Sequence, residues 1–177
     1  MCELTEGRVA TCDSAGGSKK AYLYSIKDSL GITNYLTGPT VVGGAITAMT
    51  LKATKYLYAF NVEPETIETS ADSIGEATKS STAYEHKTVI TLAGNTAEDI
   101  AQATLLCKGR VGVILELNDG TFEAYHYEDG IGGKVQRSRT PGKALDDMNG
   151  SILTITSRQT MPEAKISSVI VNAMLEP

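Results

Sequence analysis

The sequence predicts a mainly β fold: an antiparallel β-sandwich or barrel with one short flanking α-helix at about Asn95–Cys107. Strand-like alternation recurs along the chain, and Thr82–Tyr127 is patterned as strand, helix, strand, tight turn and strand. At 177 residues the chain is long enough for one hydrophobic core and short for two. We therefore expect residues 1–177 to form a single domain.

The first third of the chain contains two similar strand-like runs, Lys20–Ile26 and Lys55–Phe60. In both runs tyrosine recurs at every second residue. Because alternate residues of a strand share a face, the two tyrosines and the final isoleucine of the first run should lie together. Between the runs, Val41–Lys52 alternates loosely and follows a Gly-Pro turn signal. The first third of the chain is therefore expected to be rich in β-strands.

A polar segment follows at residues 63–81, where Glu, Thr, Ser, Ala and Asp dominate and aromatic residues are absent. Such a composition buries little apolar area by itself. The segment is expected to be either a solvated loop or an extended arm or hairpin that becomes ordered on a neighbouring subunit. The candidate residues of an inter-subunit arm are Thr66, Glu68, Thr69, Asp72, Glu76 and Thr78.

The next elements are a strand at Tyr84–Leu92 and the helix. Asn95 or Thr96 can cap the first helical turn, with acidic residues three positions further on, and Gly109 is placed to end the helix in a left-handed conformation. The helical stripe expected to face the interior consists of Ile100, Ala103, Thr104 and Cys107. We expect Cys107 to be a buried, reduced thiol.

A hairpin is predicted from Val111–Leu117 and Thr121–Tyr127, joined through Asn118-Asp119-Gly120. If Asp119-Gly120 is a two-residue type I′ turn, one face of the hairpin is apolar and forms the core. That face would contain Val113, Leu115, Leu117, Phe122, Ala124 and His126. The opposite face would expose Tyr125 and Tyr127 as a candidate oligomer face, whereas a three-residue loop would shift the partners and change both faces. A last strand is expected at Ser151–Ser157.

Few residues suggest chemistry. His86 is followed and preceded by residues that point to the other side of its strand, and His126 lies in a different element. Neither histidine has carboxylate or cysteine neighbours at metal-ligand spacing, and the glycine-rich stretches do not match a phosphate-binding loop. We therefore expect no catalytic residues, no cofactor, no metal and no enzymatic activity.

Charge and hydropathy restrict the partners. A formal charge of −5 argues against tight wrapping of nucleic acid, although a weakly acidic surface can line a passage through which DNA slides without binding. No apolar run is long enough to span a membrane, and the N-terminal residues lack the pattern of a signal peptide. We expect a protein made in the cytoplasm that has no membrane partner.

The order of elements between about Thr82 and Ala164 resembles that of tail tube (major tail) proteins and related tail structural proteins of tailed bacteriophages. The residues that carry the resemblance are Thr82-x-Tyr84, the capped helix, Asn118-x-Gly120, Gly130–Gly133, Asp147-Met148-Asn149-Gly150, Leu153–Thr156 and Ala164. Proteins of this family are β-sandwiches or barrels with a flanking helix, and they form homohexameric rings that stack into a tube for DNA.

The resemblance implies a virion structural protein of the phage tail, assembled in the bacterial cytoplasm. Its partners would be copies of itself in hexameric rings and other tail or virion proteins, with DNA only as passing cargo. A head-tail connector and a capsid-associated decoration protein are alternatives within the same class. An alternative from another class is a carbohydrate- or protein-binding β-sandwich that uses Tyr125 and Tyr127 as an exposed platform.

Overall fold

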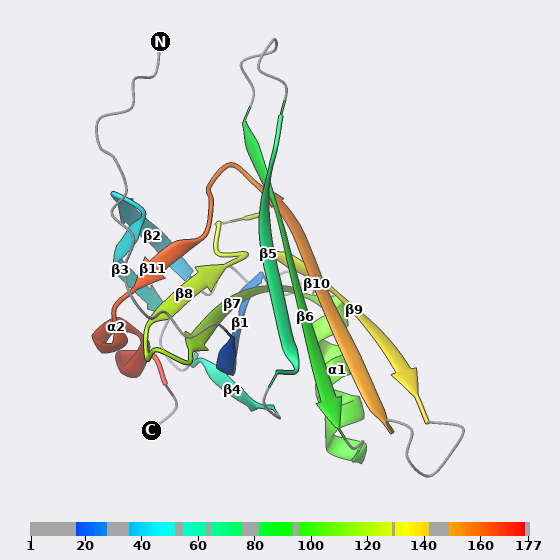
Figure 1. Cartoon of the computed structure of the whole chain (residues 1–177). Helices are drawn as coiled ribbons and strands as arrows, with labels where there is room; N and C mark the ends of the chain where they lie inside the picture. The colour runs from blue at the N-terminus through cyan, green and yellow to red at the C-terminus, as the bar shows by residue number, and fades with distance from the viewer. Residues whose placement is uncertain are drawn as a thin grey trace.

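A computed structural model describes residues 17–27, 36–51, 55–62, 65–75, 82–93, 96–128, 130–141 and 149–175. The strands are β1 (Ser18–Lys27), β2 (Leu36–Val42), β3 (Ala45–Leu51), β4 (Tyr58–Asn61), β5 (Ile67–Ile74), β6 (Ala83–Ala93), β7 (Arg110–Leu117), β8 (Phe122–Tyr125), β9 (Gly133–Thr140), β10 (Gly150–Gln159) and β11 (Ala164–Ile166). The helices are α1 (Ala97–Lys108) and α2 (Ser168–Ala173). The predicted mainly β fold with a short flanking helix is confirmed (Figure 1).

The strands form one extended sheet in the order β2-β3-β11-β8-β7-β9-β10-β6-β5, to which β1 and β4 are added through β7. The strand β7 is the branch point. It pairs with β1 on one side, and on the other with β9 through Arg110 and Val111 and with β8 from Val113 to Glu116. The strands β5, β6, β10 and β9 therefore leave the branch point as a four-stranded layer that packs over β1 and β7 (Figure 1).

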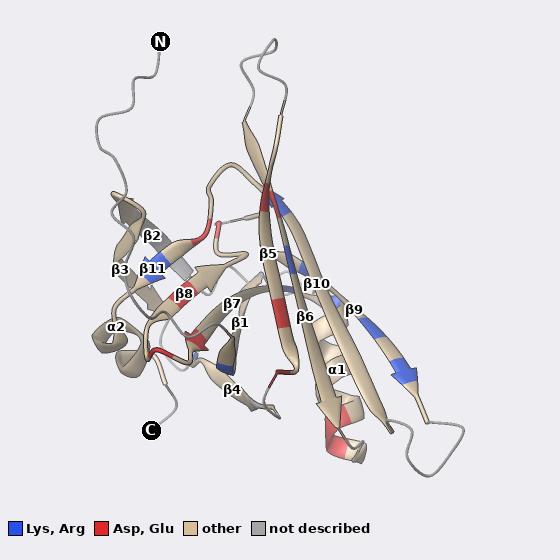
Figure 2. Ribbon diagram, in the orientation of Figure 1, with Lys and Arg blue, Asp and Glu red and all other residues tan. Residues whose placement is uncertain are grey.

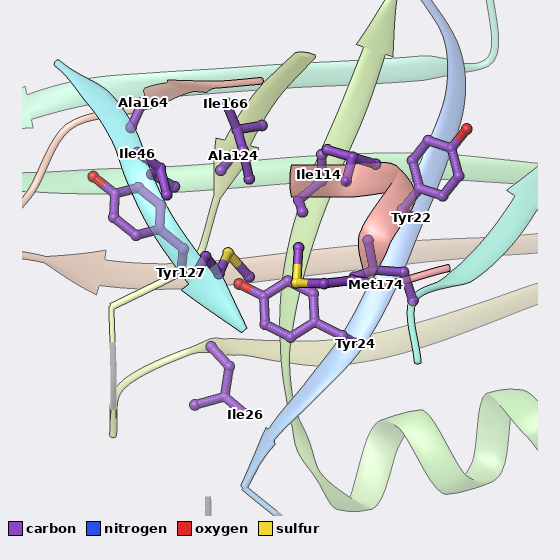
Figure 3. Packing of buried hydrophobic residues seen from close by; sticks show 13 residues of the cluster. Tyr22, Tyr24, Ile26, Ile46, Ile114, Ala124, Tyr127, Ala164, Ile166 and Met174 are labelled. Atoms are coloured by element: carbon purple, nitrogen blue, oxygen red, sulfur yellow. The ribbon is translucent and has the colours of Figure 1, made fainter. Parts of the chain in front are cut away.

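Two hydrophobic clusters lie on the opposite faces of β1 and β7. The sheet-side cluster, under the four-stranded layer, contains Ala21, Leu23, Ile90, Ala103, Val111, Val113, Leu115, Tyr125, Val135, Leu153 and Ile155. The α2-side cluster contains Tyr22, Tyr24, Ile26, Ile46, Met49, Leu57, Ile114, Ala124, Tyr127, Ala164, Ile166, Val171 and Met174 (Figure 3). Alternate residues of β1 and β7 thus enter different clusters, which confirms that Tyr22, Tyr24 and Ile26 share a face.

The helix α1 begins as the sequence predicts and ends differently. Thr96 and Asp99 form a reciprocal capping box, with the Asp99 N–H donating to Thr96 Oγ1 at 3.2 Å and the Thr96 N–H donating to Asp99 Oδ2 at 2.9 Å. Gly109 has φ −105°, so the predicted left-handed ending is wrong: the chain passes directly into the extended backbone of β7. Of the predicted interior stripe, Ala103 is buried and Cys107 is half-buried, whereas Ile100 and Thr104 are exposed.

The pair Leu117 and Thr121 closes a three-residue hairpin loop, Asn118–Gly120, and this loop length shifts the predicted hairpin register. The Leu117 N–H donates to the Thr121 carbonyl at 2.9 Å, and Gly120 adopts a φ of +82°. The Asp119 carboxylate supports the turn by accepting a 2.8 Å hydrogen bond from the Thr121 N–H. As a result Ile114, and not Leu115, lies opposite Ala124.

The register shift divides the predicted core face between two clusters. Val113, Leu115 and Leu117 contribute to the sheet-side cluster, while Phe122 and Ala124 contribute to the α2-side cluster. The prediction that Val113, Leu115, Leu117, Phe122, Ala124 and His126 share one face is therefore wrong. A one-residue change in register moves every side chain of a strand to its other face.

Candidate functional site

The predicted arm contains a regular strand of this chain's own sheet. Residues Ile67–Ile74 form β5, which pairs with β6 along its full length, so this part of the segment is neither a loop nor a detached arm. Thr69 is half-buried, Glu68 and Asp72 are exposed, and Thr66 precedes the strand. Glu76 and Thr78 lie outside the described residues. The outer edge of β5 pairs with no other described strand.

The strand β9 forms the other side of the four-stranded layer. Its residues from Lys134 to Thr140 pair with β10, and on its other edge only Gly133 and Lys134 pair with β7. No third described strand pairs with β9, whose partners are β10 and, at Gly133 and Lys134, β7. The four-stranded layer is bounded by β5 on one side and by β9 on the other, and β5 ends the strand order of the sheet.

The outer face of the four-stranded layer is polar. It consists of the residues that alternate with the buried ones: Glu68, Ser70, Asp72, Glu85, Lys87, Val89, Thr91, Ile152, Thr154, Thr156, Arg158, Lys134, Gln136, Ser138 and Thr140. Three of these residues are carboxylates and three are cations. The Arg158 Nε lies 3.3 Å from Glu85 Oε1 across the β6–β10 pair. Threonine is frequent on this face, as is common for strands with a solvated side.

Tyr125 and Tyr127, predicted as an exposed oligomer face or binding platform, are buried. They are 8% and 0% exposed, because the register shift turns Tyr125 toward the sheet-side cluster and Tyr127 toward the α2-side cluster. The Tyr125 hydroxyl donates to Glu123 Oε2 at 2.8 Å, and the Tyr127 hydroxyl donates to the Pro162 carbonyl at 2.8 Å. Neither ring is available as a platform on this chain.

Both histidines of the chain meet in the interior, at a place the sequence does not predict. The rings of His86 and His126 stand edge to face, with centroids 5.6 Å apart. His126 Nδ1 lies 2.7 Å from Ser157 Oγ, and His126 Nε2 lies 3.1 Å from Thr88 Oγ1. A φ of +55° at His126 breaks the alternation after β8, so Tyr125 and His126 both face the four-stranded layer.

Burial favours the neutral form of both imidazole rings. The His126 N–H donates to His86 Nδ1 at 3.3 Å, which places the proton of neutral His86 on Nε2. Burial, and to a smaller extent the neighbouring His86 ring, lowers the pKa of His126 to about 3. Burial also lowers the pKa of His86, while the Glu163 carboxylate, the Met161 carbonyl and the Glu128 carboxylate act in the opposite direction.

The polar residues around the histidines could not be recognised as a group from the sequence. Thr88 and Ser157 occupy the same strand phase as Ile90 and Ile155, so their inward orientation follows from alternation once the strands are known. Nothing in their spacing reveals that they meet His126. Among the described residues, no group of three His, Cys, Asp or Glu side chains could hold a metal ion. These hydrogen bonds connect β6 and β10 with the residue that follows β8.

A shallow hollow lies between β3 and α2. Its apolar lining includes Met49, Leu51, Tyr56, Val169, Ile170 and Met174. Thr50 and Lys55 add polar groups to the rim. The lining contains no acid–base pair and no cluster of metal ligands, so it suggests no reaction.

Comparison with family models, curated proteins and solved structures gave no match for this chain. Neither of the helices in the described part of the chain is long and apolar enough to cross a membrane. The candidate functional features are therefore the outer edge of β5, which pairs with no other described strand, and the polar outer face of the four-stranded layer.

Proposed function

We propose that this chain is a virion structural protein, a phage tail tube subunit that assembles into stacked homohexameric rings around a passage for DNA. Support comes from the resemblance over residues 82–164 and from the free edge of β5. A head-tail connector or a capsid-associated protein would use the same kind of edge. The three roles differ in whether the rings stack, join to another ring or bind a shell.

The edge of β5 is the observation that carries the proposal. An unpaired strand edge is a template for another chain, and monomeric proteins usually protect such edges with short strands, bulges, proline or lysine. The strand β5 has eight residues, keeps a continuous register with β6, and contains neither proline nor lysine. This strand is in a form suited to pairing with a strand from another subunit.

The outer face of the four-stranded layer suits the wall of a DNA passage. Its three carboxylates and three cations balance in formal charge. Figure 2 shows acidic residues on β5 and basic residues on β9 and β10. Tight binding of DNA requires clustered Lys and Arg that displace counterions from the phosphates. A polar face with balanced charge would let DNA pass without holding it, and we assign this face to the passage.

The proposal is tested on the purified full-length chain. Light scattering and negative-stain microscopy over a range of protein and salt concentrations should detect rings, and tubes at the highest concentrations. Tubes of stacked rings favour the tail tube, whereas single rings that never stack favour a connector. A strict monomer at high concentration in every salt would contradict the proposal.

A further inference from the structure

Two buried polar side chains, one on β6 and one at the end of β10, have no hydrogen-bond partner in the protein. His86 is 0% exposed and Gln159 is 1% exposed. His86 Nε2 and both amide atoms of Gln159, Oε1 and Nε2, form no hydrogen bond with any described protein atom. Nearly all buried polar atoms of folded proteins are paired, because an unpaired one costs free energy. These three atoms therefore need a partner from outside the polypeptide.

The register of the sheet brings the two side chains to one place. His86 lies opposite Ser157 in the β6–β10 pair, and Gln159 lies opposite Tyr84. Both side chains belong to the buried face of the four-stranded layer, so they are diagonal neighbours across the pair. Diagonal neighbours are about 7–8 Å apart, which leaves room for a small group between two long side chains.

The hydrogen-bonding roles of the unpaired atoms define this small group. His86 Nδ1 accepts a hydrogen bond from the His126 backbone N–H at 3.3 Å, so the neutral ring carries its proton on Nε2, which is a donor. The Gln159 amide supplies an acceptor and a donor, whichever way it is turned. A buried donor and a buried acceptor are thus neighbours without bonding to each other. The group between them must accept a hydrogen bond from one and donate to the other.

We propose that an ordered water molecule binds between His86 and Gln159, accepting from His86 Nε2–H and donating to the Gln159 amide oxygen. Two hydrogen bonds of ordinary length join polar atoms about 5 Å apart, which suits diagonal neighbours. A cation cannot accept from an N–H group, and a simple anion cannot donate to the amide oxygen, whereas water does both. The second O–H of the water can donate to the Met161 carbonyl, which lies beside the His86 ring. Three hydrogen bonds are typical of a buried water.

The chain that follows Gln159 encloses this site. The Thr160 N–H donates to Glu128 Oε2 at 2.6 Å, and the Tyr127 hydroxyl donates to the Pro162 carbonyl at 2.8 Å. These two hydrogen bonds connect the segment after β10 with the segment after β8. The water would therefore leave only when these segments separate, and it would join β10 to β6 at the end of their pairing.

A structure of the purified full-length chain, at a resolution at which ordered water is visible, tests the proposal directly. We expect one water within about 3.2 Å of both His86 Nε2 and an amide atom of Gln159. A direct hydrogen bond between the two side chains, a different bound group, or close contact with no water between them would overturn the proposal. The test is independent of the proposed function, because the site lies inside a single chain.

A variant without the amide provides the second test. Q159M keeps the length of the side chain but can neither donate to the water nor accept from it. The unfolding equilibrium constant in urea should rise about tenfold, because His86 Nε2–H then loses its bridged acceptor. A structure of the variant should show no water at this place.

The matched control is Q136M, which replaces an exposed glutamine of β9 by the same residue. This variant should unfold as the wild type does and should keep the water. A Q159M variant that is as stable as Q136M, or that retains the water, would contradict the proposal. If Q159M does not fold, the wild-type structure decides the question.

Discussion

The strands β7 and β5 have the same length and belong to the same sheet, yet they have opposite environments. Both edges of β7 are paired, and its residues from Val111 to Leu115 are buried on both faces. The strand β5 is paired on one edge, and none of its residues is fully buried. The comparison shows that stability is concentrated at the branch point of the sheet, while the end of the four-stranded layer remains available for another chain.

The largest loss of unfolding free energy should follow from truncating a large buried side chain of β7. Leu115 is 1% exposed, and the L115A variant should lose about 3 kcal/mol of unfolding free energy through lost burial and a residual cavity. The matched change on β5, I67A, removes a half-buried side chain and should cost clearly less. Urea denaturation measures both variants, and equal losses would contradict the difference between the strands.

The next largest loss of unfolding free energy should follow from adding a side chain at a glycine of β7. A Cβ at Gly112 would clash with the ring of Tyr24, its partner residue on β1. The G112A variant should therefore lose about 1–3 kcal/mol through overpacking. Trimming the ring with Y24L should reduce the penalty, so the two changes will be less than additive in a double-mutant cycle.

The buried histidines should make stability depend on pH. The folded-state pKa of His126 is about 3, below the ordinary value of 6.5. On acidification His126 is therefore protonated at a higher pH in the unfolded state than in the folded state. Their stabilising contribution is present above pH 6.5 and is lost as the pH falls from 6.5 toward 3, by about 1 kcal/mol per pH unit for His126. Thermal melting between pH 7 and pH 4 measures this loss.

The H126N variant provides the control for the pH experiment. Asparagine tolerates a φ of +55° better than most residues and does not titrate in this range. Its melting temperature should be lower at pH 7 and should change less on acidification than that of the wild type. An equally steep acid dependence in the variant would assign the effect to other groups.

The smallest effect on the fold should come from β5. The variant E68Q/D72N removes two exposed charges on the outer face, and its unfolding free energy should lie within about 0.5 kcal/mol of the wild-type value. A large loss of stability measured by urea denaturation would mean that these carboxylates support the fold.

Several elements follow from local sequence signals. Alternation placed the strands at β1, β6, β7 and β10, and the Thr96 capping box placed the start of α1, because both signals act over a few residues. The strand β9 lacks a clear alternation of apolar residues, and β11 has only three residues, so neither carries a comparable signal. Propensity alone does not place strands whose pairing depends on tertiary contacts.

The hairpin shows where local reasoning reaches its limit. Asn118-Asp119-Gly120 permits a two-residue or a three-residue loop, and the choice moved Tyr125 and Tyr127 from the surface into the core. The histidine pair depends on the contact between β6 and β8, which are about 40 residues apart in the chain, as the sequence separation of His86 and His126 shows. The opposite charges of β5 and β9 are visible in the sequence, but their position on the two sides of one layer is not.

Hydrogen exchange of the backbone amides tests the central claim most directly, because a strand that gains a partner gains hydrogen bonds along its free edge. Mass spectrometry would compare peptides covering β5 and β7 in the monomer and in the assembled protein. We predict that the amides of β5 become protected on assembly, while the amides of β7 stay equally protected in both states. Assembly that leaves β5 exchanging at its monomer rate would contradict the account.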